Sequence, residues 1–348
     1  MDARPSRTLP ALAGLLLACM LAACSAAPAA SPTPPSTTPF PSTASVPNEA
    51  PTAAPTAAPT ESPTPAPLFP ATLNDDEGGT AVLAARPTKI VSLTPAATEI
   101  LFGLGAGDRI VGKVEDFTPY PEAAAKIPDV AKFGSVDVEK IVSLGADLVI
   151  AGGNNFNPPE SIKQLRDLGV PVLVVFAPDV AGALKDISLI GRAVGNPDGA
   201  AKISGSIQGA MASVKAATAG GTPVRTYYEL DASSGFFGPA PDYFGTEMIR
   251  IAGGDPLTSG TAGVYQIESE KILTFDPQVI LMGDAAYGVT ADQVKARPGW
   301  GTLTAVKNGD VRPIDDVIVT RPGPRLADGI RTLAVAINPG LVLPSPAP

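Results

Sequence analysis

Two stretches of the sequence place a carboxylate at the start of the same short pattern. EKIVSLGADLVI covers residues 139–150, and EKILTFDPQVIL covers residues 270–281. In both stretches a glutamate opens a short helix that leads into an apolar strand. One such glutamate would do no more than stabilise its helix by about 0.3–1 kcal/mol through the helix dipole. Two at equivalent places could present a symmetric pair of carboxylates to a two-fold partner that carries arginines.

Other reactive side chains are scarce in this chain. It contains no histidine, and its two cysteines are Cys19 and Cys24 near the N-terminus. The folded part therefore has no disulfide, no Ser-His-Asp or Cys-His nucleophile, and none of the usual zinc, manganese or copper sites. We expect no metal held by the protein itself and no covalently bound cofactor, although ferric iron on Asp, Glu or Tyr oxygens stays open. A metal could also arrive inside a chelate.

The charge balance argues against a nucleic-acid partner. The chain has 25 Lys and Arg residues against 34 Asp and Glu residues, which gives a net charge of −9. A nucleic-acid-binding domain normally carries a basic surface, because it must neutralise phosphates. We therefore expect no nucleic acid among the partners.

The N-terminal region predicts export and attachment to a membrane. Arg4 and Arg7 precede the apolar stretch ALAGLLLACMLAA, which is typical of a signal peptide over residues 1–23 and is short for a membrane span. The stretch ends in Leu-Ala-Ala-Cys, which resembles the bacterial lipobox and predicts lipidation of Cys24. Residues 24–75 are rich in Ala, Pro, Ser and Thr, so we expect a disordered tether.

The rest of the chain alternates buried-strand runs with helical patterns, which predicts an α/β fold with mainly parallel sheets. We expect a folded domain over residues 88–345, with an N-lobe at 88–178 and a C-lobe at 222–345. Residues 179–220 between them are helical in pattern and lack strands. The sequence thus predicts two Rossmann-like lobes joined by a long, rigid helix.

Three segments carry a resemblance to a known family. They read KIVSLTPAATEILFGLGAGDRIVG, SVDVEKIVSLGADLVIAGG and RPGWGTLTAVKNGDVRPIDDVIVTRPGPRLADGIRTLA. Together they resemble the solute-binding proteins of ABC importers for vitamin B12 and iron chelates, the helical-backbone class III of periplasmic binding proteins. The similarity covers about residues 88–340, and ISGSIQGAMASVKAATAG matches the rigid connecting helix.

The resemblance implies a monomer that captures a metal chelate in the cleft between its lobes and delivers it to a dimeric ABC permease with its ATPase subunits. One surface glutamate on each lobe docks onto arginines of the permease in this family. Those glutamates fall on Glu139 and Glu270, and Glu268 is an alternative to the second. The expected location is extracytoplasmic, with the lipid anchor at the cell membrane.

Ligand contacts are expected from loops at the ends of strands, where most of the aromatic residues gather. The candidates are Phe117, Tyr120, Phe133, Asn154, Asn155, Phe156, Phe236, Phe237, Tyr243, Tyr287 and Arg321. Trp300 is expected to pack in the core instead. Neutral aromatics and amides suit cobalamin, whereas an anionic ferric siderophore needs several cations, so cobalamin is the favoured ligand.

Two other classes of protein remain as alternatives at this stage. An exported α/β enzyme could use Asp231, Asp242 or Asp284 as general acid and base. Against it, the sequence has no G-x-S-x-G elbow, no Walker loop and no G-x-G-x-x-G. A lipid-anchored haem or sensor protein with a tyrosine ligand is the second alternative.

Overall fold

The computed structural model describes residues 67–344, which lie in one compact unit. The predicted signal peptide, Cys24 and the tether up to residue 66 lie outside the described residues. None of the helices between residues 67 and 344 combines the length and the apolar composition that a bilayer crossing requires.

The N-lobe is built on a six-stranded sheet with the order β6-β5-β4-β3-β7-β8. Neighbouring strands are parallel, except that β5 and β6 form an antiparallel pair. The strands are β3 Ile90–Ser92, β4 Ile110–Val114, β5 Asp129–Lys132, β6 Ser135–Val136, β7 Leu148–Gly152 and β8 Val172–Val175. The strands β3, β7 and β8 are completely buried, as their unbroken apolar runs predict.

The C-lobe sheet has four parallel strands in the order β10-β9-β11-β12. They are β9 Val224–Glu229, β10 Gly254–Pro256, β11 Val279–Met282 and β12 Val311–Pro313. Taken in chain order, β9, β10, β11 and β12 occupy the places that β3, β4, β7 and β8 occupy in the N-lobe. The two lobes therefore repeat one topology, which is the architecture that the sequence predicted.

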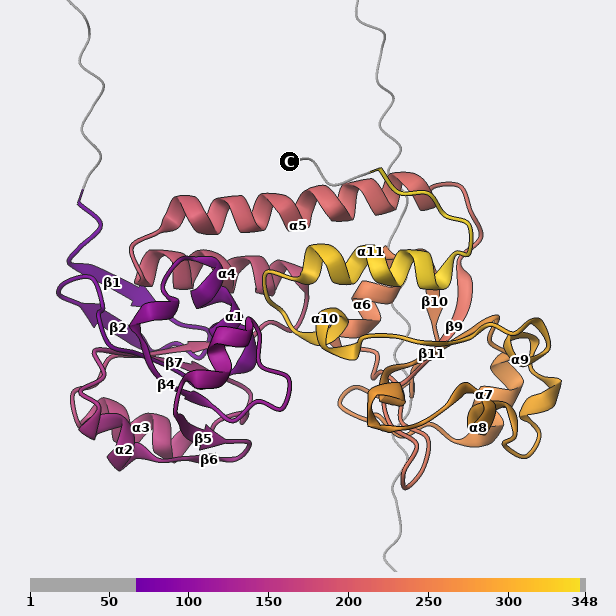
Figure 1. Cartoon of the computed structure of the whole chain (residues 1–348), viewed down its shortest axis with the longest axis horizontal. Helices are drawn as coiled ribbons and strands as arrows, with labels where there is room; N and C mark the ends of the chain where they lie inside the picture. Colours follow the sequence, from indigo (N-terminus) through magenta and orange to yellow (C-terminus); the bar gives the residue numbers. More distant parts are fainter. Residues whose placement is uncertain (1–66, 345–348) are drawn as a thin grey trace, which may run out of the picture. The chain divides into compact units, whose positions relative to one another are not determined.

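Helices cover both faces of each sheet (Figure 1). In the N-lobe, α1 and α4 pack on one face, and α2 and α3 pack on the other. In the C-lobe, α6 and α11 cover one face, and α7, α8 and α9 cover the other. The helices are α1 Pro95–Gly103, α2 Val138–Ser143, α3 Pro159–Asp167, α4 Val180–Ala193, α5 Pro197–Thr218, α6 Phe244–Ile251, α7 Ser269–Phe275, α8 Ala291–Lys295, α9 Thr304–Asn308, α10 Asp316–Thr320 and α11 Leu326–Ile337.

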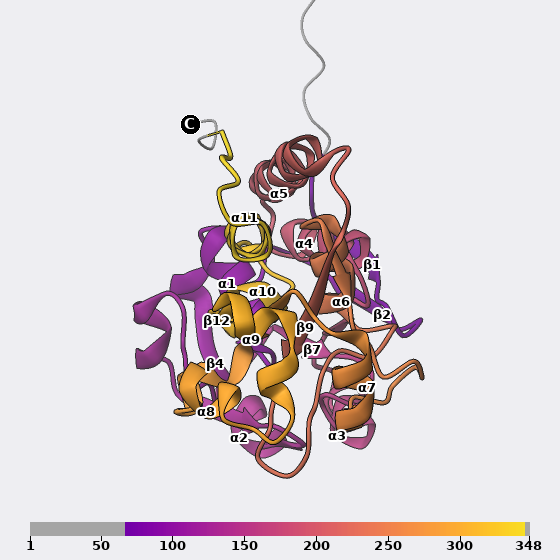
Figure 2. The same ribbon diagram turned by 90° about the vertical axis from the view of Figure 1, so that its right-hand side faces the viewer.

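The connection between the lobes is helical, as predicted. The helix α5 has 22 residues and lies along α4 on one side and α11 on the other (Figures 1 and 2). Its length is about 33 Å at 1.5 Å per residue. Buried side chains of α5, such as Ile207, Ala210 and Val214, join a core cluster that includes residues from both lobes. One apolar core therefore runs from lobe to lobe beneath α5.

The fold begins earlier in the chain than the sequence predicted. The strands β1 (Ala71–Asn74) and β2 (Thr80–Leu83) form an antiparallel hairpin, whereas the sequence predicts a tether up to residue 75 and a folded domain from residue 88. Leu73 and Leu83 of the hairpin are buried in the core. The alternation LNDDEGGTAVL, with its Gly-Gly turn, is a hairpin signal that could have corrected the boundary.

The close approach of α4 and α5 depends on Gly191. A Cβ atom at this position would overlap the methyl group of Ala200 in α5, whereas the exposed Gly205 of α5 has open space around it. We expect Gly191→Ala to lower the free energy of unfolding by about 1–3 kcal/mol, because a tight helix contact must open to admit the methyl group. The matched change Gly205→Ala should raise it by roughly 0.5–1 kcal/mol, since alanine is the better helix former. Chemical denaturation measures both, and equal effects at the two sites would contradict the role of Gly191.

Candidate functional site: the cleft between the two lobes

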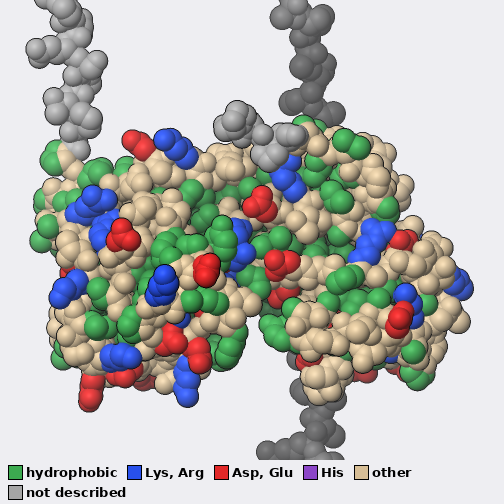
Figure 3. Space-filling model, viewed as in Figure 1, with side chains coloured by type: hydrophobic (Ala, Val, Ile, Leu, Met, Phe, Trp, Pro, Cys, Tyr) green, Lys and Arg blue, Asp and Glu red, His purple; other side chains and the backbone are tan. Residues whose placement is uncertain are grey.

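A cleft of about 870 Å³ lies between the lobes. On the N-lobe side it is lined by the segments that follow β3, β7 and β8. On the C-lobe side it is lined by residues 242–244, 263, 265 and 320–322. Figure 3 shows the surface hollowed between the lobes, on the side away from α5. Carboxyl ends of parallel strands are the usual place for a ligand in α/β folds.

Six of the predicted ligand residues line this cleft. They are Phe133, Asn154, Asn155, Phe156, Tyr243 and Arg321. Three aromatic residues that were not among the predicted ligand contacts also line it, namely Phe176, Phe244 and Tyr265. Phe176 directly follows β8 and Phe244 begins α6, so the sequence pattern places both in regular elements rather than in loops.

The other five candidates lie outside the cleft lining. Phe236 packs 5.0 Å from the ring of Trp300 in the C-lobe core, and Phe237 forms backbone bridges with Asp231 and Gln266. Both rings belong to a loop that folds back on its own lobe. Trp300 is fully buried, which confirms that it packs in the core.

The other three aromatics, Phe117, Tyr120 and Tyr287, are exposed. The side chain of Tyr120 lies against the guanidinium of Arg325, with its ring centroid 4.2 Å from the Arg325 Cζ. Phe117 is 90% exposed, and Tyr287 is 80% exposed beside a different cavity. Loop position alone could not separate these rings from the ones that face the ligand space.

The loop after β7 forms the N-lobe wall of the cleft. Asn154 and Asn155 adopt left-handed backbone conformations, with φ of 54° and 61°. Asparagine tolerates this region better than most residues, because its short polar side chain can bond locally. The turn brings Phe156 against Phe133 in an edge-to-face pair with centroids 5.5 Å apart. An aromatic surface thereby faces the cleft.

The N-terminal hairpin holds this wall in place. In the turn between β1 and β2, Glu77 accepts a hydrogen bond from the Asn154 backbone at 3.0 Å, and Asp76 accepts one from the Phe176 backbone at 2.7 Å. Asp75 is buried, forms an ion pair with Arg166 at 2.5 Å and accepts a bond from the backbone of the neighbouring β8. Acids of the hairpin thus position two loops that line the cleft.

Asp186 of α4 is a buried carboxyl group in the lining of the cleft. Burial and the neighbouring Asp76 raise its pKa from 3.8 to about 8. Asp76 keeps its charge and pairs with Lys185. At neutral pH Asp186 therefore contributes a neutral carboxylic acid rather than an anion.

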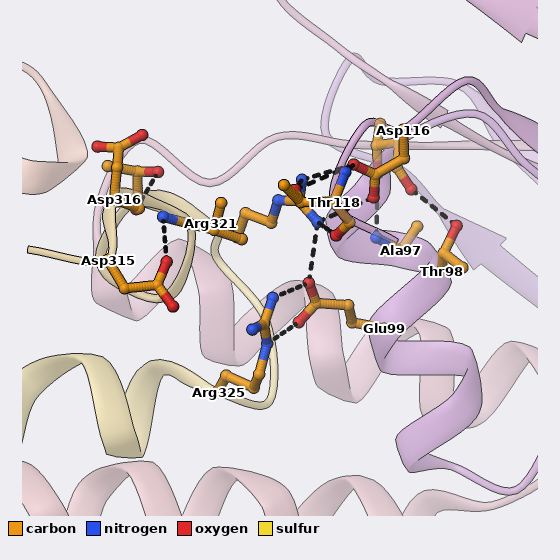
Figure 4. A network of polar contacts seen from close by, with 12 residues as sticks. Ala97, Thr98, Glu99, Asp116, Thr118, Asp315, Asp316, Arg321 and Arg325 are labelled. Carbon is orange, nitrogen blue, oxygen red and sulfur yellow. Dashed lines mark hydrogen bonds and ion pairs between the residues drawn. The ribbon is translucent and has the colours of Figure 1, made fainter. Parts of the chain in front are cut away.

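The rim of the cleft is closed by an ion-pair network between the lobes (Figure 4). The Arg321 guanidinium donates to Asp116 at 2.8 and 2.9 Å and to Glu99 at 3.2 Å. Arg325 donates to both oxygens of Glu99, at 2.9 and 2.6 Å. Burial opposes the ionisation of Asp116, yet the bonds from Arg321 hold its pKa below the usual value. The two carboxylates neutralise the two arginines.

Two tyrosines form the C-lobe wall. Tyr243 and Tyr265 pack edge-to-face with centroids 5.6 Å apart. Burial raises the pKa of both phenols, with smaller contributions from Asp316 near Tyr243 and from Asp242 near Tyr265. Both side chains are therefore neutral and face the cleft as aromatic surfaces with a hydroxyl group.

The predicted docking glutamates occupy equivalent positions on the two lobes. Glu139 is the second residue of α2, and Glu270 is the second residue of α7. Both are exposed, and neither has an ion-pair partner among residues 67–344. Figure 1 places α2 and α7 on the side of the molecule away from α5. Glu268, the alternative, is exposed one residue before α7 begins.

The acids proposed for an enzyme do not converge on one site. Asp242 lies at the cleft between the lobes, whereas Asp231 and Asp284 line a separate cavity in the C-lobe. Within residues 67–344, no group of three or more His, Cys, Asp or Glu side chains is arranged to hold a metal ion. The cleft is therefore equipped to bind a ligand by shape, aromatic contact and a few hydrogen bonds.

Comparisons with known sequences agree with this geometry. A family model described as periplasmic binding protein matches residues 90–317. YvrC of Bacillus subtilis, an uncharacterized ABC transporter substrate-binding lipoprotein, is 33% identical over 277 residues, which are 78% of this chain and 87% of the relative. The vitamin B12-binding protein of Vibrio cholerae is 28% identical over 263 residues, which are 74% of this chain and 93% of the relative.

Solved structures give the same result. The periplasmic vitamin B12-binding protein BtuF of Vibrio cholerae has a TM-score of 0.63 and 26% identity, over 72% of this chain and 96% of that chain. The haem-binding protein RhuT of Roseiflexus has a TM-score of 0.63 and 25% identity, over 72% of this chain and 97% of that chain. The names of these relatives are those of binding proteins. The comparisons confirm the predicted fold and the resemblance, and they give no support to the enzyme alternative.

The buried Asp186 makes stability depend on pH. Between pH 3.8 and about 8 the folded protein keeps a proton on this group that the unfolded chain has lost. The free energy of unfolding should therefore fall as pH rises through this window. We expect Asp186→Asn to match the wild type near pH 4 and to exceed it at pH 8, by an amount on the order of a few kcal/mol.

Chemical denaturation across this pH range provides the measurement. The exposed Asp198 in the first turn of α5 supplies a control, because Asp198→Asn should leave the pH dependence of the wild type unchanged. A constant difference between Asp186→Asn and the wild type from pH 4 to pH 8 would contradict the protonated state of Asp186.

Proposed function

The chain belongs to the periplasmic binding protein family, and we propose that it captures a cobalamin-type corrinoid in the cleft and delivers it to the permease of an ABC importer. We propose further that it acts as a monomer outside the cytoplasm, held at the membrane by a lipid on Cys24. The lipobox-like Leu-Ala-Ala-Cys and the naming of YvrC as a lipoprotein support the anchor.

The charge state of the cleft is the observation that carries the choice of ligand. Arg321 is the one Lys or Arg side chain among the described residues that line it, and Asp116 and Glu99 already neutralise its charge. A catecholate or carboxylate siderophore is anionic and needs cationic partners that remain free. A corrinoid with neutral amide side chains needs aromatic surfaces and hydrogen-bonding groups, which this cleft offers.

The same cleft is less suited to haem. Haem carries two propionate anions, which need cationic partners that remain free. Arg321 is the one Lys or Arg among the described residues of the lining and already pairs with Asp116 and Glu99, so neither propionate meets a free cation. We therefore favour a corrinoid over haem as the ligand, although RhuT is named as a haem-binding protein.

The ligand proposal is tested by calorimetry on the chain with Cys24→Ser, titrated with cyanocobalamin, haemin and two ferric siderophores, one catecholate and one carboxylate. Cyanocobalamin should bind at least tenfold more tightly than the others. Phe176→Ala and Tyr265→Ala should each weaken its binding by about tenfold or more, because each removes an aromatic contact worth roughly 1.5–3 kcal/mol when fully buried. Phe117→Ala is the control, since Phe117 is exposed outside the cleft. Tight binding of a siderophore or of haemin without cyanocobalamin binding would reject the corrinoid.

Delivery to the permease is proposed to use Glu139 and Glu270. Each is exposed on a short helix at an equivalent position of its lobe and is free to meet an arginine of the partner. Removing one partner of a desolvated ion pair costs about 2–5 kcal/mol of binding free energy, and removing one partner of a rim-exposed pair costs less than about 1 kcal/mol. Both carboxylates lie outside the residues that line the cleft, so their removal should spare ligand affinity.

Transport in reconstituted vesicles tests the docking at limiting concentrations of the binding protein. Glu139→Ala and Glu270→Ala should each slow uptake, and the double variant should be slower than either. Glu160→Ala is the matched control, because Glu160 is also exposed and also the second residue of its helix. Glu268→Ala distinguishes the alternative assignment in the C-lobe. If the double variant transports at the wild-type rate, neither glutamate contributes to docking, and both only stabilise the first turns of their helices.

A further inference from the structure

The C-lobe contains a second cavity, of about 560 Å³, at the carboxyl ends of β9 and β11. Its described lining consists of Leu230, Asp231, Ala232, Ser233, Asp284, Tyr287, Val289, Gln293 and Arg297. None of these residues lines the cleft between the lobes. The cavity is therefore a separate space, and the proposed function does not use it.

Behind the lining of this cavity, and bonded to Arg297 of that lining, lies one carboxylate whose charge is balanced. Glu229 is the last residue of β9 and is completely buried. The Arg297 guanidinium donates to its two oxygens, at 2.5 and 2.8 Å. Arg297 in turn lies over the rings of Trp300 and Phe236, at 4.6 and 5.1 Å from their centroids. This arginine is fixed by its contacts and is engaged by Glu229.

The carboxylate of Asp284 lies beside Glu229 and has no ion-pair partner among the described residues. Asp284 follows β11, which is paired with β9 so that Met282 faces Glu229. Asp284 is 3% exposed, and no group within residues 67–344 donates a hydrogen bond to its carboxyl oxygens. The Glu229 carboxyl group is close enough to share a hydrogen bond with Asp284, but only while Asp284 carries a proton. A buried acceptor without a partner costs about 1–3 kcal/mol, and a charged one costs more. The wall of the cavity therefore carries a group that a ligand could satisfy.

The charges around Asp284 define the ligand that would satisfy it. Glu229, Asp284 and Asp231 face one cation, Arg297, and the phenol of Tyr227 is the other titratable group close by. Asp231 at the rim accepts only local bonds from Ser233. This excess of acid repels anions and favours a cation with N–H donors. A bare metal ion fits poorly, because no group of three or more metal-ligating side chains is found in the described part of the chain.

We propose that this C-lobe cavity binds a small organic cation, an ammonium or guanidinium compound, through Asp284. The cationic group donates to the Asp284 carboxylate, and Asp231 provides a further carboxylate acceptor in the lining. The ring of Tyr287, which lines the cavity and is 80% exposed, offers a face for a cation–π contact.

Protonation of Asp284 gives the site a pH signature. Burial and the negative charge of Glu229 raise the pKa of Asp284 to about 6. Above this pH the carboxylate is ionised and attracts a cation. Below it the group is neutral, so the affinity for the cation should fall as pH drops from 7.5 to 5.

The proposal is tested by calorimetry on the chain with Cys24→Ser, titrated with n-butylammonium, n-butylguanidinium and their neutral isostere 1-butanol. We expect saturable one-to-one binding of the cations, with dissociation constants of roughly a millimolar or below for ligands of this size, and no saturable binding of 1-butanol. Asp284→Asn should lower the affinity for both cations tenfold or more. The exposed Asp292 of the neighbouring α8 provides the control, because Asp292→Asn should leave binding unchanged.

A second variant guards against loss of folding. Tyr287→Ala changes an exposed side chain and should lower the affinity for both cations severalfold. Its melting temperature should stay that of the wild type. Asp284→Asn should melt no lower than the wild type, since it removes an unpaired buried charge. Absence of saturable binding by both cations, equal binding of 1-butanol, or full binding by Asp284→Asn would each overturn the proposal. Binding of cyanocobalamin tests the proposed function separately.

Discussion

The carboxylate of Glu99 is buried in α1 of the N-lobe, and its hydrogen-bond partners Arg321 and Arg325 come from the C-lobe. Its side chain is 1% exposed, so ionisation without these partners would carry a large desolvation cost. Separating the lobes would strand this charge, and it would also open the apolar core that runs beneath α5. Together these two contacts join the lobes, and the cleft lies between the surfaces that they bring together.

The same interaction sets the chemistry of the cleft. Because Asp116 and Glu99 engage Arg321, an arginine in the lining offers little free charge to a ligand. Asp186, with its raised pKa, adds hydrogen-bonding capacity at neutral pH without adding a negative charge. Recognition then rests on aromatic walls from both lobes. A large ligand with many neutral amides suits such a surface better than an anionic chelate does.

The two lobes share a topology, but the segments that follow their strands line different cavities. After β7 and β8 the N-lobe places Phe156 and Phe176 in the cleft, and the hairpin acids Asp76 and Glu77 hold these loops. After β9 and β11 the C-lobe instead encloses a polar cavity around Asp284. The short helices α2 and α7 present their glutamates at equivalent positions on both lobes. The shared topology thus places the proposed docking glutamates at equivalent positions, whereas the cavities at the strand ends differ between the lobes.

The sequence by itself determined the alternation of strands and helices, the helical connector, the burial of Trp300 and the equivalent placement of Glu139 and Glu270. These features follow from local periodicity and capping, which neighbouring residues specify. Only the tertiary structure decided which rings face the cleft, because a turn such as Asn154–Asn155 sets the direction of the side chains that follow. It also decided that Arg321 is neutralised by Glu99, 222 positions away in the chain. Such a pairing has no local signature, since it forms only when the two lobes fold against each other.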